Sequence, residues 1–182
     1  SVANAFLRET TDEKLAARGC SADVIAKVKT LRAEARYLRA LCYTQALDLY
    51  RNVPHVTENS KIGNVLPDQI MGPELFTYIE TELKECEADM LDPTVGFSAN
   101  YGHANKAANW ALLSRLYLNA EVYAGVKKYT ECITYSNKVI AAGYQLEPVY
   151  GDMFRADNHL SKEMIHPLRY DGDQTMTWGG MT

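Results

Sequence analysis

A long periodic segment between Ser21 and Pro54 constrains the fold of this chain more than any other feature. Apolar or small side chains recur there at every third or fourth position, which is the spacing that lines one face of an α-helix. Ser21 or Asp23 is placed to cap the first turn, and the helix must end before Pro54, because the residue preceding a proline avoids the helical conformation. We therefore expect one long helix with a buried apolar face centred on Leu38. That face comprises Val24, Val28, Leu31, Ala35, Leu38, Cys42, Ala46 and Leu49.

Three more helices are predicted downstream. Residues 73–90 begin with a proline at the first helical position, which its fixed backbone angle suits, and end before Pro93. Residues 105–124 carry apolar side chains around more than one face, which is typical of a helix that lies between two neighbours. Residues 129–142 end at Gly143, which suits a left-handed C-cap.

The helix predicted for residues 73–90 has two contrasting faces. The apolar face is expected to enter the core and comprises Leu75, Ile79, Leu83, Cys86 and Met90. The acidic face is expected to be solvated rather than to bind a metal, and comprises Glu80, Glu82, Glu85, Glu87 and Asp89.

The last two predicted helices match part of a tetratricopeptide repeat. Trp110, Leu113, Ser114 and Tyr117 follow the W-x2-L-G-x2-Y pattern, with serine in the glycine position. After Gly143 the helical periodicity stops, and residues 163–170 alternate enough for a short strand that Pro167 confines to an edge. The expected fold class is therefore mainly α, with tetratricopeptide-like helix pairs over residues 1–143 and a loop-rich region with a short strand over residues 144–182.

Charge and composition exclude several classes of protein. The net charge is −4 and the sequence has no basic cluster, which argues against binding to nucleic acid. No apolar run is long enough for a transmembrane helix. The four cysteines match neither a zinc pattern nor a redox pair, and Cys42, Cys86 and Cys132 are expected to act as small core residues. No leader and no acylatable cysteine stands near residue 1, so we expect any targeting information to lie outside this chain.

The order of residues in the first helix also resembles a known family. The run Arg32-Ala-Glu-Ala-Arg-Tyr-Leu-Arg-Ala40 is followed by Leu49-Tyr-x-Asn-Val-Pro-x-Val-Thr-Glu58, and collinear matches continue through residues 74–83, 107–123 and 143–150 to Trp178-Gly-Gly180. This set is similar to the SusD-like (RagB/SusD) family, the glycan-binding outer-membrane lipoproteins of Bacteroidetes nutrient-uptake systems.

The resemblance implies a fold, a function and a partner. Family members are helical, non-enzymatic proteins of the cell surface that bind oligosaccharide or polysaccharide and cover a SusC-like TonB-dependent transporter. A lipid anchor outside this chain would be its contact with the membrane. Members are usually more than twice as long, so we expect an internal fragment in which residues 144–182 begin an incomplete ligand-binding region.

Sugar binding requires flat aromatic faces together with groups that hydrogen-bond hydroxyls. Most tyrosines of the chain lie at helical packing positions, so the candidate ligand-binding residues are Tyr170, Asp171, Gln174 and Trp178 in the C-terminal loop. An ordinary surface turn is the alternative for this loop. Asp171-Gly-Asp173 lacks the distal glutamate of a calcium loop, so neither a metal site nor a cofactor is expected.

Three functions remain open at this stage. The first is a non-enzymatic glycan-binding protein that passes oligosaccharide to its transporter, and the second is a helical-repeat scaffold that binds protein and no sugar. The third is a hydrolase, which would need two carboxylates facing each other across a sugar at roughly 5–10 Å. The four histidines show no spacing typical of nucleophilic catalysis, so no catalytic residue is proposed.

Overall fold

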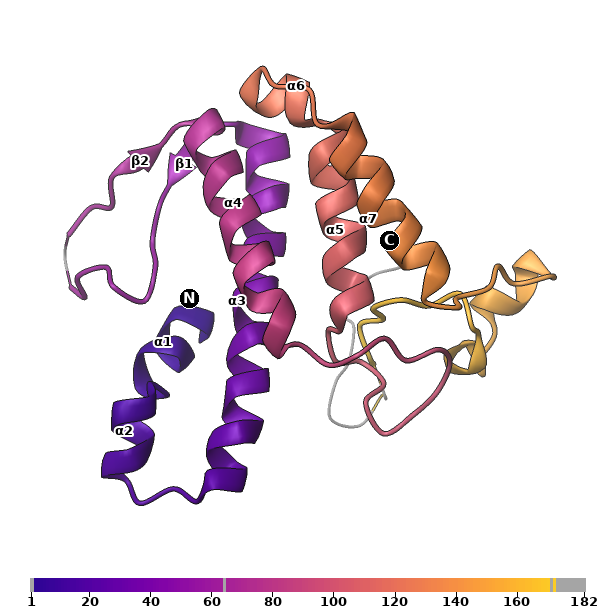
Figure 1. Ribbon diagram of the computed structural model, residues 1–182, viewed down its shortest axis with the longest axis horizontal. Coiled ribbons are helices and arrows are strands. Elements are labelled where there is room, and N and C mark those ends of the chain that lie inside the picture. The colour runs from indigo at the N-terminus through magenta and orange to yellow at the C-terminus, as the bar shows by residue number, and fades with distance from the viewer. Residues whose placement is uncertain (1, 64, 171, 173–182) are drawn as a thin grey trace.

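The computed structural model describes residues 2–63, 65–170 and 172, and within them the chain is mainly α-helical, as predicted (Figure 1). Two short strands, β1 (Val53–Pro54) and β2 (Gln69–Ile70), pair antiparallel with Val53 opposite Ile70. No helix among the described residues is long and apolar enough to cross a membrane. The α-helices are α1 (Val2–Glu9), α2 (Asp12–Ala17), α3 (Ala22–Tyr50), α4 (Gly72–Cys86), α5 (Lys106–Leu118), α6 (Ala120–Ala124) and α7 (Tyr129–Ala141).

Local capping signals account for most helix boundaries. The Ser21 hydroxyl accepts from the Val24 amide at the start of α3, and the Asn105 side chain accepts from the Ala107 and Ala108 amides at the start of α5. After α7, Gly143 adopts φ +89°, a conformation that a side chain would strain. The helix predicted over residues 105–124 is interrupted at Asn119, where α5 ends and α6 begins. The short helices α1 and α2 were not predicted.

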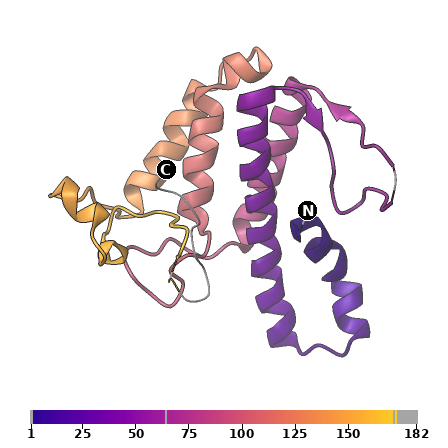
Figure 2. The same cartoon turned by 180° about the vertical axis from the view of Figure 1, so that it is seen from behind.

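The helices form two antiparallel pairs with a shared core. α3 packs against α4 and α5 packs against α7, while α1 and α2 lie beside the first half of α3, away from α7 (Figures 1 and 2). The helix predicted over residues 73–90 ends earlier, at Cys86, but its predicted core face is confirmed, since all five apolar residues of that face, including Met90 beyond the end of α4, are buried. From α5, Leu112, Leu113, Leu116 and Tyr117 join the same cluster.

The buried face of α3 differs from the prediction. Residues Ala33, Tyr37, Ala40, Thr44 and Leu47 are buried, whereas Leu31, Leu38 and Leu49 of the predicted face are exposed. Both sets repeat every three or four residues, so periodicity alone could not decide which one faces α4. The middle of the predicted face, residues 35–46, instead lines an open apolar groove of about 780 Å³ between α1 and α3, whose lining includes Phe6, Leu38, Cys42, Ala46 and Val56.

The acidic face of α4 is only partly solvated, which corrects a second prediction. Glu82 is 8% exposed and lies opposite two arginines of α3. Its Oε1 is 2.7 Å from Arg36 Nη2, and its Oε2 pairs with Arg39, whose side chain is also buried. Arg39 further pairs with Glu58 in the segment after β1. This buried charge network joins α3, α4 and that segment.

The α5–α7 pair explains the serine in the repeat pattern. Ser114 Oγ lies 2.7 Å from Ser136 Oγ and 3.5 Å from the Cys132 carbonyl oxygen. The small serine side chain therefore stands at a point where α5 and α7 approach each other closely. Trp110 is half-buried and donates to Glu87 at 2.8 Å.

Two smaller predictions also need correction. The strand expected at residues 163–170 is absent from the described residues, where that segment is irregular and has no strand partner. Pro167 removes a backbone donor, so an alternating pattern was insufficient without a neighbouring strand. Among the cysteines, Cys86 is buried and Cys132 packs against the core, but Cys42 is exposed in the α1–α3 groove.

Candidate ligand-binding pocket

Two loop segments lie beneath α5 and α7 (Figure 1). Side chains of these segments line a pocket of about 430 Å³. The first segment, residues 91–104, leads from α4 into α5, and the second, residues 155–170, follows α7. The pocket brings together residues that are 55 to 73 positions apart in the chain. Its lining comprises Phe97, Tyr101, Ala156, Asn158, His159, Leu168, Arg169 and Tyr170.

Aromatic side chains form one part of this lining, which we name the aromatic pocket. The ring centroids of Phe97 and Tyr101 are 5.4 Å apart, and the His159 ring meets Phe97 edge-on at 5.1 Å. Phe97 is 59% exposed, so its ring is accessible to a ligand. Tyr170 is exposed on the second segment. The arrangement therefore offers flat apolar faces from both segments.

Polar groups lie beside these rings. The Asn158 side chain donates to the Met153 carbonyl oxygen at 3.1 Å, which fixes the plane of its amide. Burial raises the pKa of the Tyr101 phenol, which therefore stays neutral and able to both donate and accept near neutral pH. With the His159 imidazole and the Arg169 guanidinium, the pocket has donors and acceptors of several geometries.

Neighbouring elements hold the first segment in place. The Lys106 amide donates to the Leu91 carbonyl oxygen at 2.9 Å, and Leu91 and Asn105 form an isolated parallel bridge. Tyr144 OH donates to the Thr94 carbonyl oxygen and accepts from Asn105 Nδ2, both at 3.2 Å. These bonds tie the first segment to the starts of α5 and of the loop that follows α7.

The predicted site and the observed pocket overlap in one residue. Tyr170 lines the pocket, whereas Asp171, Gln174 and Trp178 lie outside the described residues, so their part in a site stays a prediction. The sequence interpretation missed Phe97, Tyr101, Asn158, His159 and Arg169. The available signal was two aromatic residues four positions apart, between Gly96 and Gly102, in a segment without helical periodicity.

The described residues contain no group of three histidine, cysteine or acidic side chains that could hold a metal ion. The α1–α3 groove is larger than the aromatic pocket but is lined almost wholly by apolar groups, so it offers little with which to orient a polar ligand. The aromatic pocket is therefore the candidate site for a polar ligand with apolar faces.

Comparison with known proteins identifies similar chains. The chain is 45% identical over 155 residues to the starch-binding protein SusD of Bacteroides thetaiotaomicron, a match that covers 83% of this chain and 27% of SusD. The structure of surface glycan-binding protein A from Bacteroides thetaiotaomicron in complex with laminarihexaose matches 80% of this chain and 29% of its own, with a TM-score of 0.64 and 25% identity. No protein-family model matches the chain.

A laminarin-binding SusD-like protein shares the fold, with a TM-score of 0.73 and 24% identity over 90% of this chain and 34% of its own. The chain thus spans about a quarter of the length of SusD and about a third of the structural relatives. The similarity to SusD-like proteins predicted from the residue order is confirmed in sequence and in fold.

Proposed function

We propose that this SusD-like chain belongs to a non-enzymatic protein that binds carbohydrate, and that the aromatic pocket contacts the sugar. The single observation that carries the proposal is the convergence of exposed aromatic faces and polar groups in that pocket, on two loop segments distant in sequence. The relatives support the ligand class, since SusD is described as a starch-binding protein and surface glycan-binding protein A was solved in complex with laminarihexaose.

The chemistry of the pocket suits a pyranose ring. One face of such a ring consists of C–H groups, which stack on aromatic faces such as those of Phe97 and Tyr101. The hydroxyls at its rim need paired donors and acceptors, which Asn158, His159 and Arg169 provide. We propose that Asp171, Gln174 and Trp178 add to this contact, since they lie within eight positions of Tyr170 in the chain.

We propose binding without hydrolysis. The lining residues carry aromatic, amide, imidazole and guanidinium groups, which orient hydroxyls. Hydrolysis of a glycosidic bond would instead use two carboxylates placed across the bond.

A cell-surface location and a transporter partner complete the proposal. By resemblance to the RagB/SusD lipoproteins, the protein would sit on the outer membrane through a lipid anchor and work with a SusC-like TonB-dependent transporter in polysaccharide uptake. The outer face of α7 supports a protein contact, because Ile133 and Ile140 are exposed on it. The same face favours the alternative of a helical-repeat scaffold that binds protein and no sugar.

Binding calorimetry of the intact protein with soluble starch and with laminarin tests the pocket. We expect Phe97→Ala/Tyr101→Ala to abolish measurable binding. The control is Tyr150→Ala/Phe154→Ala, a second aromatic pair, with ring centroids 5.2 Å apart, that is exposed and lies outside the pocket. Equal polysaccharide binding by both double variants would contradict the proposed site. Release of reducing ends from the polysaccharide would favour a hydrolase. If the protein binds a SusC-like transporter but has no affinity for any polysaccharide, the result would favour a helical-repeat scaffold that binds protein only.

A further inference from the structure

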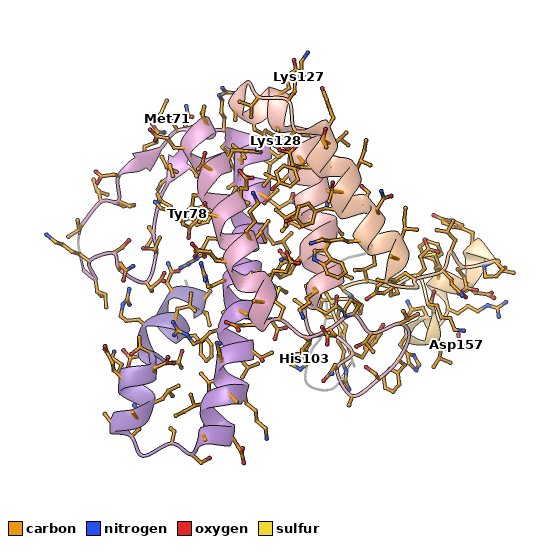
Figure 3. All side chains as sticks on the ribbon, viewed as in Figure 1. Met71, Tyr78, His103, Lys127, Lys128 and Asp157 are labelled. Atoms are coloured by element: carbon orange, nitrogen blue, oxygen red, sulfur yellow. The ribbon has the colours of Figure 1, made fainter. Side chains whose placement is uncertain are left out.

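Glu34 of α3 reaches across to the first segment of the aromatic pocket. Its Oε1 accepts from the Ala104 amide at 2.8 Å, and its Oε2 lies 2.9 Å from His103 Nδ1. His103 lies in the loop that leads into α5, 69 residues from Glu34 (Figure 3). Ala104 is buried, so its amide depends on this protein acceptor rather than on water. One carboxylate therefore closes the end of the segment that carries Phe97 and Tyr101.

One turn further along α3, Tyr37 reaches the second segment. Its hydroxyl lies 3.4 Å from His166 Nδ1, and the two rings meet edge-on with centroids 5.4 Å apart. Tyr37 is buried, and His166 lies only a few residues before the pocket residues Leu168, Arg169 and Tyr170. Both walls of the pocket are thus tied to the same face of one helix, because residues three apart on a helix are neighbours.

We propose that Glu34 is a positioning residue for carbohydrate binding, acting through the loop of residues 91–104 rather than by touching the sugar. The inference rests on the proposed function of the aromatic pocket. Without the carboxylate, the Ala104 amide loses its acceptor and the His103 ring loses its partner, so the loop samples more conformations. Part of the binding free energy is then used to order Phe97 and Tyr101. The affinity becomes weaker, although no contact to the ligand is removed.

The test compares variants of the intact protein by calorimetry with soluble starch and laminarin as probes. Glu34→Ala is expected to weaken binding about tenfold, because two aromatic side chains must be ordered on binding. Glu34→Gln keeps an acceptor for the Ala104 amide and should recover most of the affinity. Glu85→Ala is the matched control, since Glu85 pairs with Arg36 on the same helix pair at 2.6 Å and touches neither pocket segment.

Hydrogen exchange gives a readout that does not depend on the sugar. Glu34→Ala should speed hydrogen exchange of the backbone amides of residues 92–104, and of the Ala104 amide in particular. The amides of α5 and α7 should stay protected as in the wild type. A role in global folding would instead raise exchange throughout the helices.

The outcomes separate the two proposals. If Phe97→Ala/Tyr101→Ala abolishes binding but Glu34→Ala binds like the wild type, the positioning role is wrong and the pocket stands. If Phe97→Ala/Tyr101→Ala leaves binding intact, the proposed pocket is wrong and the role of Glu34 in binding is wrong with it. Unchanged exchange of residues 92–104 in Glu34→Ala would contradict the anchoring role by itself.

Discussion

Tyr37 and Leu38 are adjacent on α3 but lie on different faces of the helix. Tyr37 is 4% exposed within the core, whereas Leu38 is 38% exposed in the α1–α3 groove. The apolar face predicted from periodicity passes through Leu38, while the face that packs against α4 passes through Tyr37 and Leu47. Truncating Leu38 should therefore cost little stability, although the periodicity placed Leu38 at the centre of the buried face.

Truncation should therefore separate the two faces. In this chain Leu38→Ala is expected to cost less than about 1 kcal/mol of unfolding free energy, as at an exposed position. Leu47→Ala, at a site 1% exposed, should cost about 2–5 kcal/mol because it leaves a cavity. Chemical denaturation of both variants gives the two values. Equal losses would place both leucines in the core.

Removing one partner of the buried charge network should be costly. Glu82→Ala leaves Arg39 buried with one of its two carboxylate partners missing, and is expected to cost about 3 kcal/mol. Glu85→Ala, on an exposed carboxylate, should cost less than about 1 kcal/mol. Urea denaturation compares the two. A loss at Glu82 no larger than at Glu85 would show that the network is solvated.

Acidification should weaken the contact between Tyr37 and His166. Burial lowers the pKa of His166 from its ordinary 6.5, and Glu34 opposes the shift only in part. The folded state therefore binds fewer protons there than the unfolded state, so stability is complete above pH 6.5 and falls as the pH decreases below it.

His166→Gln should flatten the dependence of stability on pH between pH 7 and about pH 5 without removing it, because burial and Arg39 also lower the pKa of His55. Denaturation midpoints measured across this interval provide the check. A slope identical to that of the wild type would mean that His166 titrates as it does in the unfolded chain.

The close approach of α5 and α7 should reject a larger residue. Ser114→Leu would insert a branched side chain where two serine hydroxyls lie 2.7 Å apart, and is expected to cost about 1–3 kcal/mol through overpacking. Ser114→Ala should cost about 1 kcal/mol, the usual value of one hydrogen bond. Thermal melting with a measured enthalpy gives both numbers. A neutral Ser114→Leu would mean that the helix pair has room to separate.

Trp178→Ala in the intact protein is expected to weaken carbohydrate binding without lowering the melting temperature. An exposed indole stacks on the C–H face of a pyranose, and Asp171 and Gln174 are close by in the chain to bind its hydroxyls. Calorimetry with soluble starch, combined with a melting curve, measures both effects. Unchanged affinity would exclude Trp178 from the site, and a large drop in melting temperature would identify it as a packing residue.

Part of the candidate site was accessible from sequence and part was not. Tyr170 was selected because it belongs to a loop that combines aromatic faces with hydrogen-bonding side chains. The same rule applied to residues 91–104 would have selected Phe97 and Tyr101. Their proximity to His159 could not be predicted, because it depends on how two loops separated by a helix pair fold back toward each other.

The sequence by itself determined where α3, α4, α5 and α7 begin, the core face of α4 and the pairing of α5 with α7. Caps such as Ser21 and Asn105 act within one turn, and the small residue Ser114 acts where its own helix meets the next one, so the information is local. Only the tertiary structure decided which face of α3 is covered, that Glu82 is buried, and where the aromatic pocket lies. Those outcomes depend on contacts such as Arg36 with Glu82 and Tyr37 with His166, across 46 and 129 residues. A charged or apolar pattern on one helix is compatible with several partners, and the partner that actually packs against it determines whether the pattern is buried or exposed.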